Sequence, residues 1–151
     1  MVNGIIAGIA TAISNEFGDD YTIYTEEIEQ GFKEPCFFIQ SITAAERQFL
    51  GRRYLFNQSF VVQYFPEEDK TSNEDRYSVA ERMMRVLEYI KQFGTEEESI
   101  LRGVQRNYRI IDKMLNLFVD YNFFAYMEIP EEAFMEILDG SYKIKKIKEE
   151  I

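Results

Sequence analysis

Three acidic clusters are the first residues that suggest chemistry. They lie at residues 26–29, 67–69 and 96–98, and each contains three carboxylates. Paired carboxylates can hydrolyse glycosidic bonds or hold divalent cations. Each cluster falls in a predicted connection, however, where solvated polar side chains are common, and no other reactive group converges there. We therefore interpret the clusters as solvated loops, and a small hydrolase is the least favoured of the functions considered.

Cys36 is the only cysteine, and the sequence contains no histidine. A nucleophilic cysteine needs an adjacent base, and histidine is the commonest base and a frequent zinc ligand. A cysteine between Pro35 and Phe37 in a predicted strand is typical of a small core residue. Gly4 and Gly8 lack the Gly-Lys-Ser/Thr ending of a phosphate-binding loop. We predict no catalytic residue, no metal site and no cofactor, so the protein is not expected to be an enzyme.

The segment Gln48–Tyr54 mixes apolar side chains with arginines in a predicted connection between two strands. Two interpretations of Phe49 and Leu50 stay open, namely burial in the core or contact with another protein. Interface hot spots combine apolar groups with arginine, and adjacent arginines in an acidic chain suit an acidic surface on another copy. The candidate interface residues are Arg47, Phe49, Leu50, Gly51, Arg52 and Arg53.

The composition indicates one globular domain without a membrane or nucleic-acid partner. The chain has 151 residues, of which 46% are hydrophobic, with 13 Phe and 10 Tyr to build a core. Its net charge of −10 opposes nonspecific binding to phosphate backbones and to anionic membranes. No apolar run approaches the roughly 20 residues of a membrane span, and the first residues lack the basic region of a signal peptide. A single cysteine fits a reducing cytoplasm.

Hydrophobic periodicity predicts an α+β fold, with an antiparallel sheet of about five strands and two helices packed on one face. The spacing of apolar residues predicts helices over 2–17 and 75–92, the first ending at Gly18 and the second capped by Ser72 or Asn73. Alternation and β-branched or aromatic content predict strands over 21–25, 36–42, 54–65, 100–111 and 114–127. Residues 43–53 are predicted to form a long connection. The sequence after Pro130 suits either a helix or a hairpin.

Several ordered motifs resemble one family of proteins from long-tailed phages and prophages of Gram-positive bacteria, the tail terminator or tail-completion proteins. The motifs are EFGDDYTIYTEEIEQGFKEPCFFI at 16–39, LGRRY at 50–54, QYFP at 63–66, VAERM at 79–83 and FVDYNFFAY at 118–126. The similarity spans about residues 1–130, and the last twenty or so residues match less well. Asp112-Lys113 stands where the family pattern leads us to expect Asp-Gly, a difference that concerns the turn type.

This resemblance implies a structural role. Tail terminators form a ring, usually a hexamer, on the head-proximal end of the tail tube, where the ring stops polymerisation and faces the head connector. The implied partners are other copies of the chain, the major tail tube protein and the head–tail connector protein. The implied locations are the host cytoplasm during assembly and then the virion tail. We expect a terminator-like domain over 1–130 and a C-terminal extension over 131–151. A head–tail connector subunit or a tube-like protein is the alternative.

Overall fold

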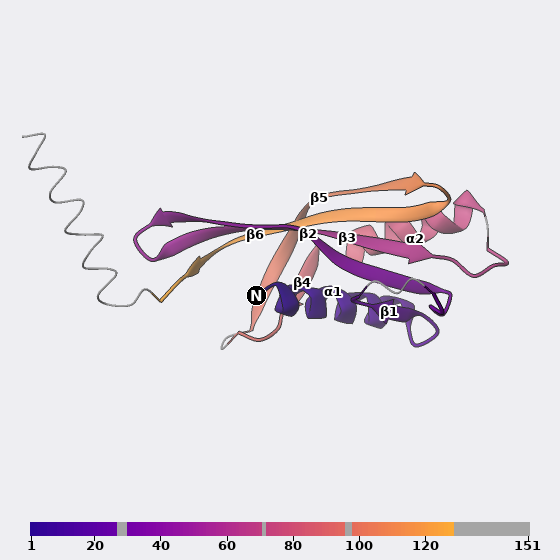
Figure 1. Cartoon of the computed structure of the whole chain (residues 1–151), viewed down its shortest axis with the longest axis horizontal. Helices are drawn as coiled ribbons and strands as arrows, with labels where there is room; N and C mark the ends of the chain where they lie inside the picture. The colour runs from indigo at the N-terminus through magenta and orange to yellow at the C-terminus, as the bar shows by residue number, and fades with distance from the viewer. Residues whose placement is uncertain (27–29, 71, 96–97, 129–151) are drawn as a thin grey trace, which may run out of the picture. The chain divides into compact units, whose positions relative to one another are not determined.

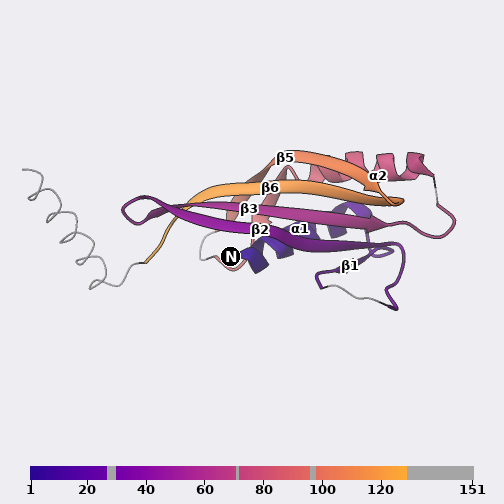
Figure 2. The same ribbon diagram turned by 45° about the horizontal axis from the view of Figure 1, so that its top comes forward.

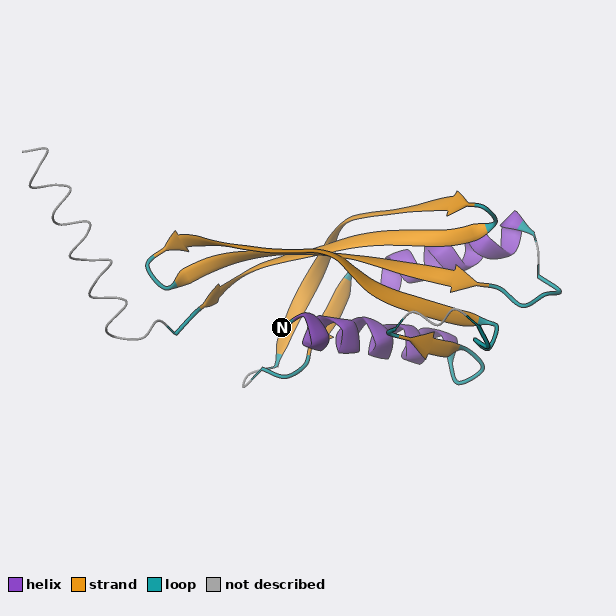
Figure 3. Ribbon diagram, viewed as in Figure 1, coloured by secondary structure: helices purple, strands orange, loops and turns teal. Residues whose placement is uncertain are grey.

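The computed structural model describes residues 1–26, 30–70, 72–95 and 98–128. Within these residues the structure has two helices and six strands, whose arrangement is drawn in Figures 1 and 3. In order they are α1 (Val2–Phe17), β1 (Thr22–Tyr24), β2 (Cys36–Leu50), β3 (Arg53–Phe65), α2 (Asn73–Val86), β4 (Tyr89–Gln92), β5 (Ser99–Ile111) and β6 (Met114–Tyr126). The α+β class is therefore confirmed.

The six strands form one sheet in the order β1-β2-β3-β6-β5-β4, and Figure 2 shows β2, β3, β6 and β5 running side by side. The sheet is mixed, because β1 pairs in parallel with β2 while β5 pairs antiparallel with both β4 and β6. The predicted sheet of about five antiparallel strands thus lacked one strand, β4, and did not anticipate the parallel pair. The predicted β5–β6 turn is confirmed, and Asp112 and Lys113 both have positive φ there (50° and 65°), as two-residue hairpin turns of type I′ require.

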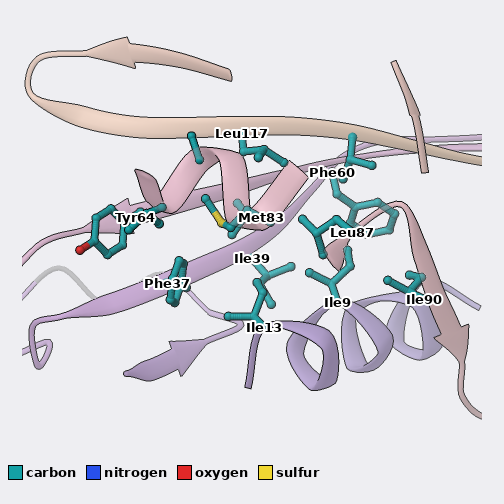
Figure 4. Close-up of a cluster of buried hydrophobic side chains, with 14 of the residues drawn as sticks. Ile9, Ile13, Phe37, Ile39, Phe60, Tyr64, Met83, Leu87, Ile90 and Leu117 are labelled. Carbon is teal, nitrogen blue, oxygen red and sulfur yellow. The ribbon is translucent and has the colours of Figure 1, made fainter. Parts of the chain in front are cut away.

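Both helices pack on one face of the sheet, as predicted, and the core lies between the helices and the sheet (Figure 4). Helix α1 contributes Ile9 and Ile13, and α2 contributes Met83; all three are fully buried. In the buried parts of β2, β3 and β6, every second residue meets these helix side chains, as expected for strands with one buried face. These residues include Phe37, Ile39, Phe60, Val62, Tyr64, Leu115, Leu117 and Val119.

The helix ends are set by local chemistry. Gly18 has a φ of 84°, and its N–H donates to the carbonyl of Ser14 (2.9 Å), which ends α1 where predicted. The Ser72 hydroxyl accepts from the N–H of Asp75 (3.4 Å) and caps α2. Acidic residues in the first turn of α2 also favour the helix dipole.

The predicted second helix is too long. It ends at Val86, and residues 89–92 form strand β4. The chain leaves the helix because two sheet groups bind its next carbonyls: the Tyr121 hydroxyl donates to Leu87 O and the Gly103 N–H donates to Glu88 O, each at 2.7 Å. In β4, exposed and buried residues alternate, but four residues are too few for this period to be separated from a helical one in the sequence.

The predicted connection over 43–53 is also wrong, because β2 continues to Leu50 and β3 begins at Arg53. Every residue from Ser41 to Leu50 is exposed. A strand with neither face buried shows no alternation, so hydrophobic periodicity could not identify it.

The chain divides into two compact units. The larger unit comprises Met1–Glu46 and Phe56–Phe123 and holds the core; the smaller comprises Arg47–Leu55 and the chain from Phe124 onward. The predicted extension over 131–151 lies outside the described residues. Within the described residues, no helix is long and apolar enough to span a membrane.

Candidate interaction site

The described acidic residues do not converge on a reactive centre. Glu67, Glu68 and Asp69 share a shallow pocket with Glu34 and Phe32, whereas Glu98 forms an ion pair with Lys91 at 3.6 Å. Residues 27–29, 96 and 97 lie outside the described part of the chain. Among the residues that are described, no group of three His, Cys, Asp or Glu side chains is placed to hold a metal ion.

Cys36 is fully buried, as expected for a core residue. Burial, with a smaller effect from the charge of Glu34, raises the pKa of its thiol to about 11. The thiolate is the nucleophilic form of cysteine, so this side chain is in its unreactive state at neutral pH.

A groove of about 460 Å³ runs between α1 and the α2–β4 junction. Its wall on α1 consists largely of small residues, among them Gly8, Thr11 and Ala12, and Tyr89 lies on the opposite wall. The groove is open to solvent and carries no pair of groups arranged for acid–base chemistry.

The sequence-predicted interface residues lie at the turn between β2 and β3. The turn is formed by Gly51 and Arg52, and Gly51 has a φ of 58°, a conformation that glycine adopts without a steric penalty. The Gln48 side-chain amide donates to the carbonyl of Gly51 (2.8 Å) and closes the turn. The chain therefore reverses direction between Leu50 and Arg53, which brings the apolar and basic residues of this segment together.

The end of β6 completes this site. The Met127 N–H donates to the carbonyl of Arg52 (2.9 Å). The ring of Phe124 meets that of Phe49 edge-on, with centroids 5.2 Å apart. The Arg53 guanidinium lies over Phe124, 4.2 Å from the ring centroid, and is 5.8 Å from that of Phe49. Arg53 is thus held by two aromatic rings through cation–π contacts.

Four large apolar side chains at this turn are exposed. The exposed fractions are 56% for Phe49, 75% for Leu50, 44% for Phe124 and 80% for Tyr126. We name these four residues, with Arg53, the tip cluster. Phe49 and Leu50 are therefore not buried in the core, and their contact with another protein stays a prediction. Exposed apolar side chains gathered in this way mark interaction surfaces.

The interface residues proposed from the sequence omitted Phe124 and Tyr126. Both belong to β6, more than seventy positions from Phe49 in the sequence. Their own pattern carried one usable signal, because Phe123-Phe124-Ala125-Tyr126 continues an apolar run past the last fully buried residue of β6, Tyr121. Only the strand order, in which β3 lies between β2 and β6, shows that they meet the β2–β3 turn.

Comparison with known proteins agrees with the motifs. The model of one protein family, described as Phage tail terminator protein, matches residues 4–133. No curated protein matches the chain. The match covers most of the sequence, including all of α2, all six strands and α1 except its first two residues. The chain therefore belongs to the phage tail terminator protein family.

Proposed function

We propose that this phage tail structural protein assembles as a six-membered ring on the head-proximal end of the tail tube. The ring ends tube polymerisation and offers the surface to which the head connector binds. Membership of the terminator family supports the tail role. The exposed tip cluster is the observation that carries the assembly role, because it provides a contact surface where no reactive centre is found among the described residues.

The composition of the tip cluster fits a protein–protein contact. Aromatic residues and arginine are enriched at interfaces and at their hot spots. The cation–π contact between Arg53 and Phe124 restrains both side chains before any partner binds. Leu50, exposed over 75% of its surface, presents a purely apolar side chain that would gain from burial by a partner.

Charge also favours contact between copies. Residues 47–55 hold three arginines and no acidic residue, a charge of +3. The rest of the chain carries 14 basic and 27 acidic residues, a charge of −13. The tip is therefore suited to an acidic surface of a second copy, and salt weakens this attraction. A closed ring needs such a contact between two different patches.

The length of tail tubes assembled without the protein tests the proposed terminator function. A missing terminator should give tubes longer than the normal length, and adding the purified protein during assembly should restore that length. Electron microscopy measures both. Tubes of normal length that fail to join heads would instead identify a head–tail connector, and the proposal would be wrong.

Replacing Leu50 with aspartate tests the tip cluster. We expect Leu50→Asp to lose tube capping while its thermal unfolding stays within about 2 °C of wild type, since exposed substitutions rarely change stability. Ile100→Asp is the matched control, because Ile100 is similarly exposed, at 68%, but lies on β5. Normal capping by Leu50→Asp would remove the tip cluster from the proposal.

A further inference from the structure

Strand β2 has an open edge. Strand β1 pairs with only its first three residues, Cys36–Phe38, and β3 lies on its other side. Within the described part of the chain, no strand therefore pairs with β2 from Ile39 onward on the β1 side. The side chains of Ser41–Glu46 are exposed as well. Unpaired N–H and C=O groups along a strand are a template for another strand.

The β1 pairing shows which residues offer these groups. The Thr22 N–H donates to the carbonyl of Pro35 (3.1 Å). Successive residues of a strand direct their backbone groups to opposite sides, so odd-numbered residues of β2 face this edge and even-numbered ones face β3. Ser41, Thr43 and Ala45 consequently direct six backbone donors and acceptors outward.

At the opposite edge of the sheet, α1 covers β4. The Phe93 N–H, directly after β4, donates to Gly4 O (3.2 Å), and Gly4 and Gly8 bring α1 against the backbone of β4, where any side chain would collide with the carbonyls of Phe93 and Lys91. Neighbouring β5 is interrupted by a bulge between Val104 and Asn107. Covering and bulging an edge are the usual ways to prevent strand addition.

The open edge lacks such protection. Residues 41–45 are exposed and contain no proline and no charged residue, and four of the five are Ser, Thr or Ala. A strand can therefore approach without removing charges from water. Because this chain covers β4 with a helix and interrupts β5 with a bulge, an edge left exposed over Ser41–Ala45 is best explained by use.

We propose that the 41–45 edge of β2 pairs through backbone hydrogen bonds with an extended segment of a second copy of this chain. The inference rests on the proposed ring, in which every copy contacts its neighbour through two different patches. Backbone pairing depends little on the partner's side chains. A neighbouring copy that is already attracted by charge can therefore supply the pairing strand.

Proline at position 43 tests this pairing. Thr43→Pro removes an N–H that faces the open edge, so no strand-pairing bond among the described residues is lost, and edge strands accept proline at such positions. We expect a folded subunit whose self-association, measured by analytical ultracentrifugation and by capping, is at least about tenfold weaker, equivalent to about 1.4 kcal/mol. Thr43→Val keeps the N–H and should assemble normally. Ile42→Pro removes an N–H that faces β3 and should lower the stability of the subunit.

A photo-crosslinker at the same position identifies the partner. In Thr43→Cys the photo-crosslinker is attached to the new thiol, which reacts selectively because Cys36 is buried. On capped tubes we expect a cross-linked product of two chains of 17.9 kDa each, and none from Lys113→Cys in the β5–β6 turn. A product with the tube protein alone would overturn the inference, as would full capping by Thr43→Pro. Neither result touches the proposed function, which fails only if the wild-type protein does not cap tubes.

Discussion

Replacing Gly8 with alanine should destabilise the chain, although alanine is the better helix former. Gly8 lies in α1 at the point where the helix meets β4. A Cβ atom at this position would fall well inside 3.0 Å of the Lys91 carbonyl oxygen, 3.1 Å from its carbon and 3.3 Å from the Ile90 Cδ1. Two of these three atoms belong to the backbone of β4, so no side-chain rotation relieves the collision.

The magnitude follows from two opposing effects. Alanine in place of glycine favours a helix interior by about 1 kcal/mol. Forcing an extra methyl group into a packed site costs about 1–3 kcal/mol and sometimes more. At Gly8 this cost lies at the upper end of the range, because the colliding atoms belong to the backbone. Helix α1 must move away from β4 by about an ångström in an interior with little free volume. We expect a net loss of about 2 kcal/mol, which lowers the melting temperature of a domain this size by about 4–8 °C.

Urea and thermal unfolding of Gly8→Ala measure this loss directly. Ser14→Ala is the control, since Ser14 is an exposed residue of the same helix and its replacement should change the free energy of unfolding by less than about 0.5 kcal/mol. If Gly8→Ala melted at or above the wild-type temperature, α1 would not lie against β4 as described, and the argument that this edge is covered would fall.

Two further predictions concern buried ionisable groups. Burial raises the pKa of both Tyr64 and Tyr121, and the Asp75 carboxylate, which accepts from the Tyr64 hydroxyl at 3.0 Å, raises that of Tyr64 further. A raised folded pKa gives stability that is complete below the unfolded value of 10.0 and is lost above it, by about 1.4 kcal/mol per pH unit for each tyrosine. Urea unfolding between pH 8 and 11 should show this decline, and Tyr64→Phe should make it shallower; a flat profile would contradict it. Cys36, whose thiol pKa is raised to about 11, should resist Ellman's reagent at pH 8 and react fully only after denaturation, whereas rapid reaction of the native protein would show that the thiol is accessible.

The sequence predicted those elements that bury one face. Helix α1 repeats isoleucine at positions 5, 9 and 13, and all three are fully buried. Strand β6 places Leu115, Leu117, Val119 and Tyr121 on the core side in strict alternation. In both cases the period of the side chains reports the period of the backbone, because only one face meets the core. Family motifs and hydrophobic pattern agreed over this part of the chain.

Elements whose conformation depends on distant partners were missed. Residues 89–92 form a strand because β5 pairs with them and the Tyr121 hydroxyl binds the carbonyl of Leu87. The tip cluster depends on Phe124, which meets Phe49 only through the sheet order. No local pattern contains this information. The arginines of QFLGRRY were recognised as unusual, but the sequence could not show that Arg53 lies over an aromatic ring.

The failure of periodicity over Ser41–Leu50 is itself informative. A strand that buries neither face in its own subunit gains little from the hydrophobic effect there, yet ordering it costs about 1–2 kcal/mol per residue in backbone entropy. Contacts made in an assembly can offset that cost, which is what the tip cluster and the open edge are proposed to do. Variants should therefore separate into two groups. Gly8→Ala should lower the stability of the subunit and leave the contact surfaces unchanged, whereas Leu50→Asp and Thr43→Pro should abolish capping in a subunit that still unfolds near the wild-type temperature. If the three variants lost stability and capping in proportion, the residues from Ser41 to Leu50 would serve the fold rather than the assembly.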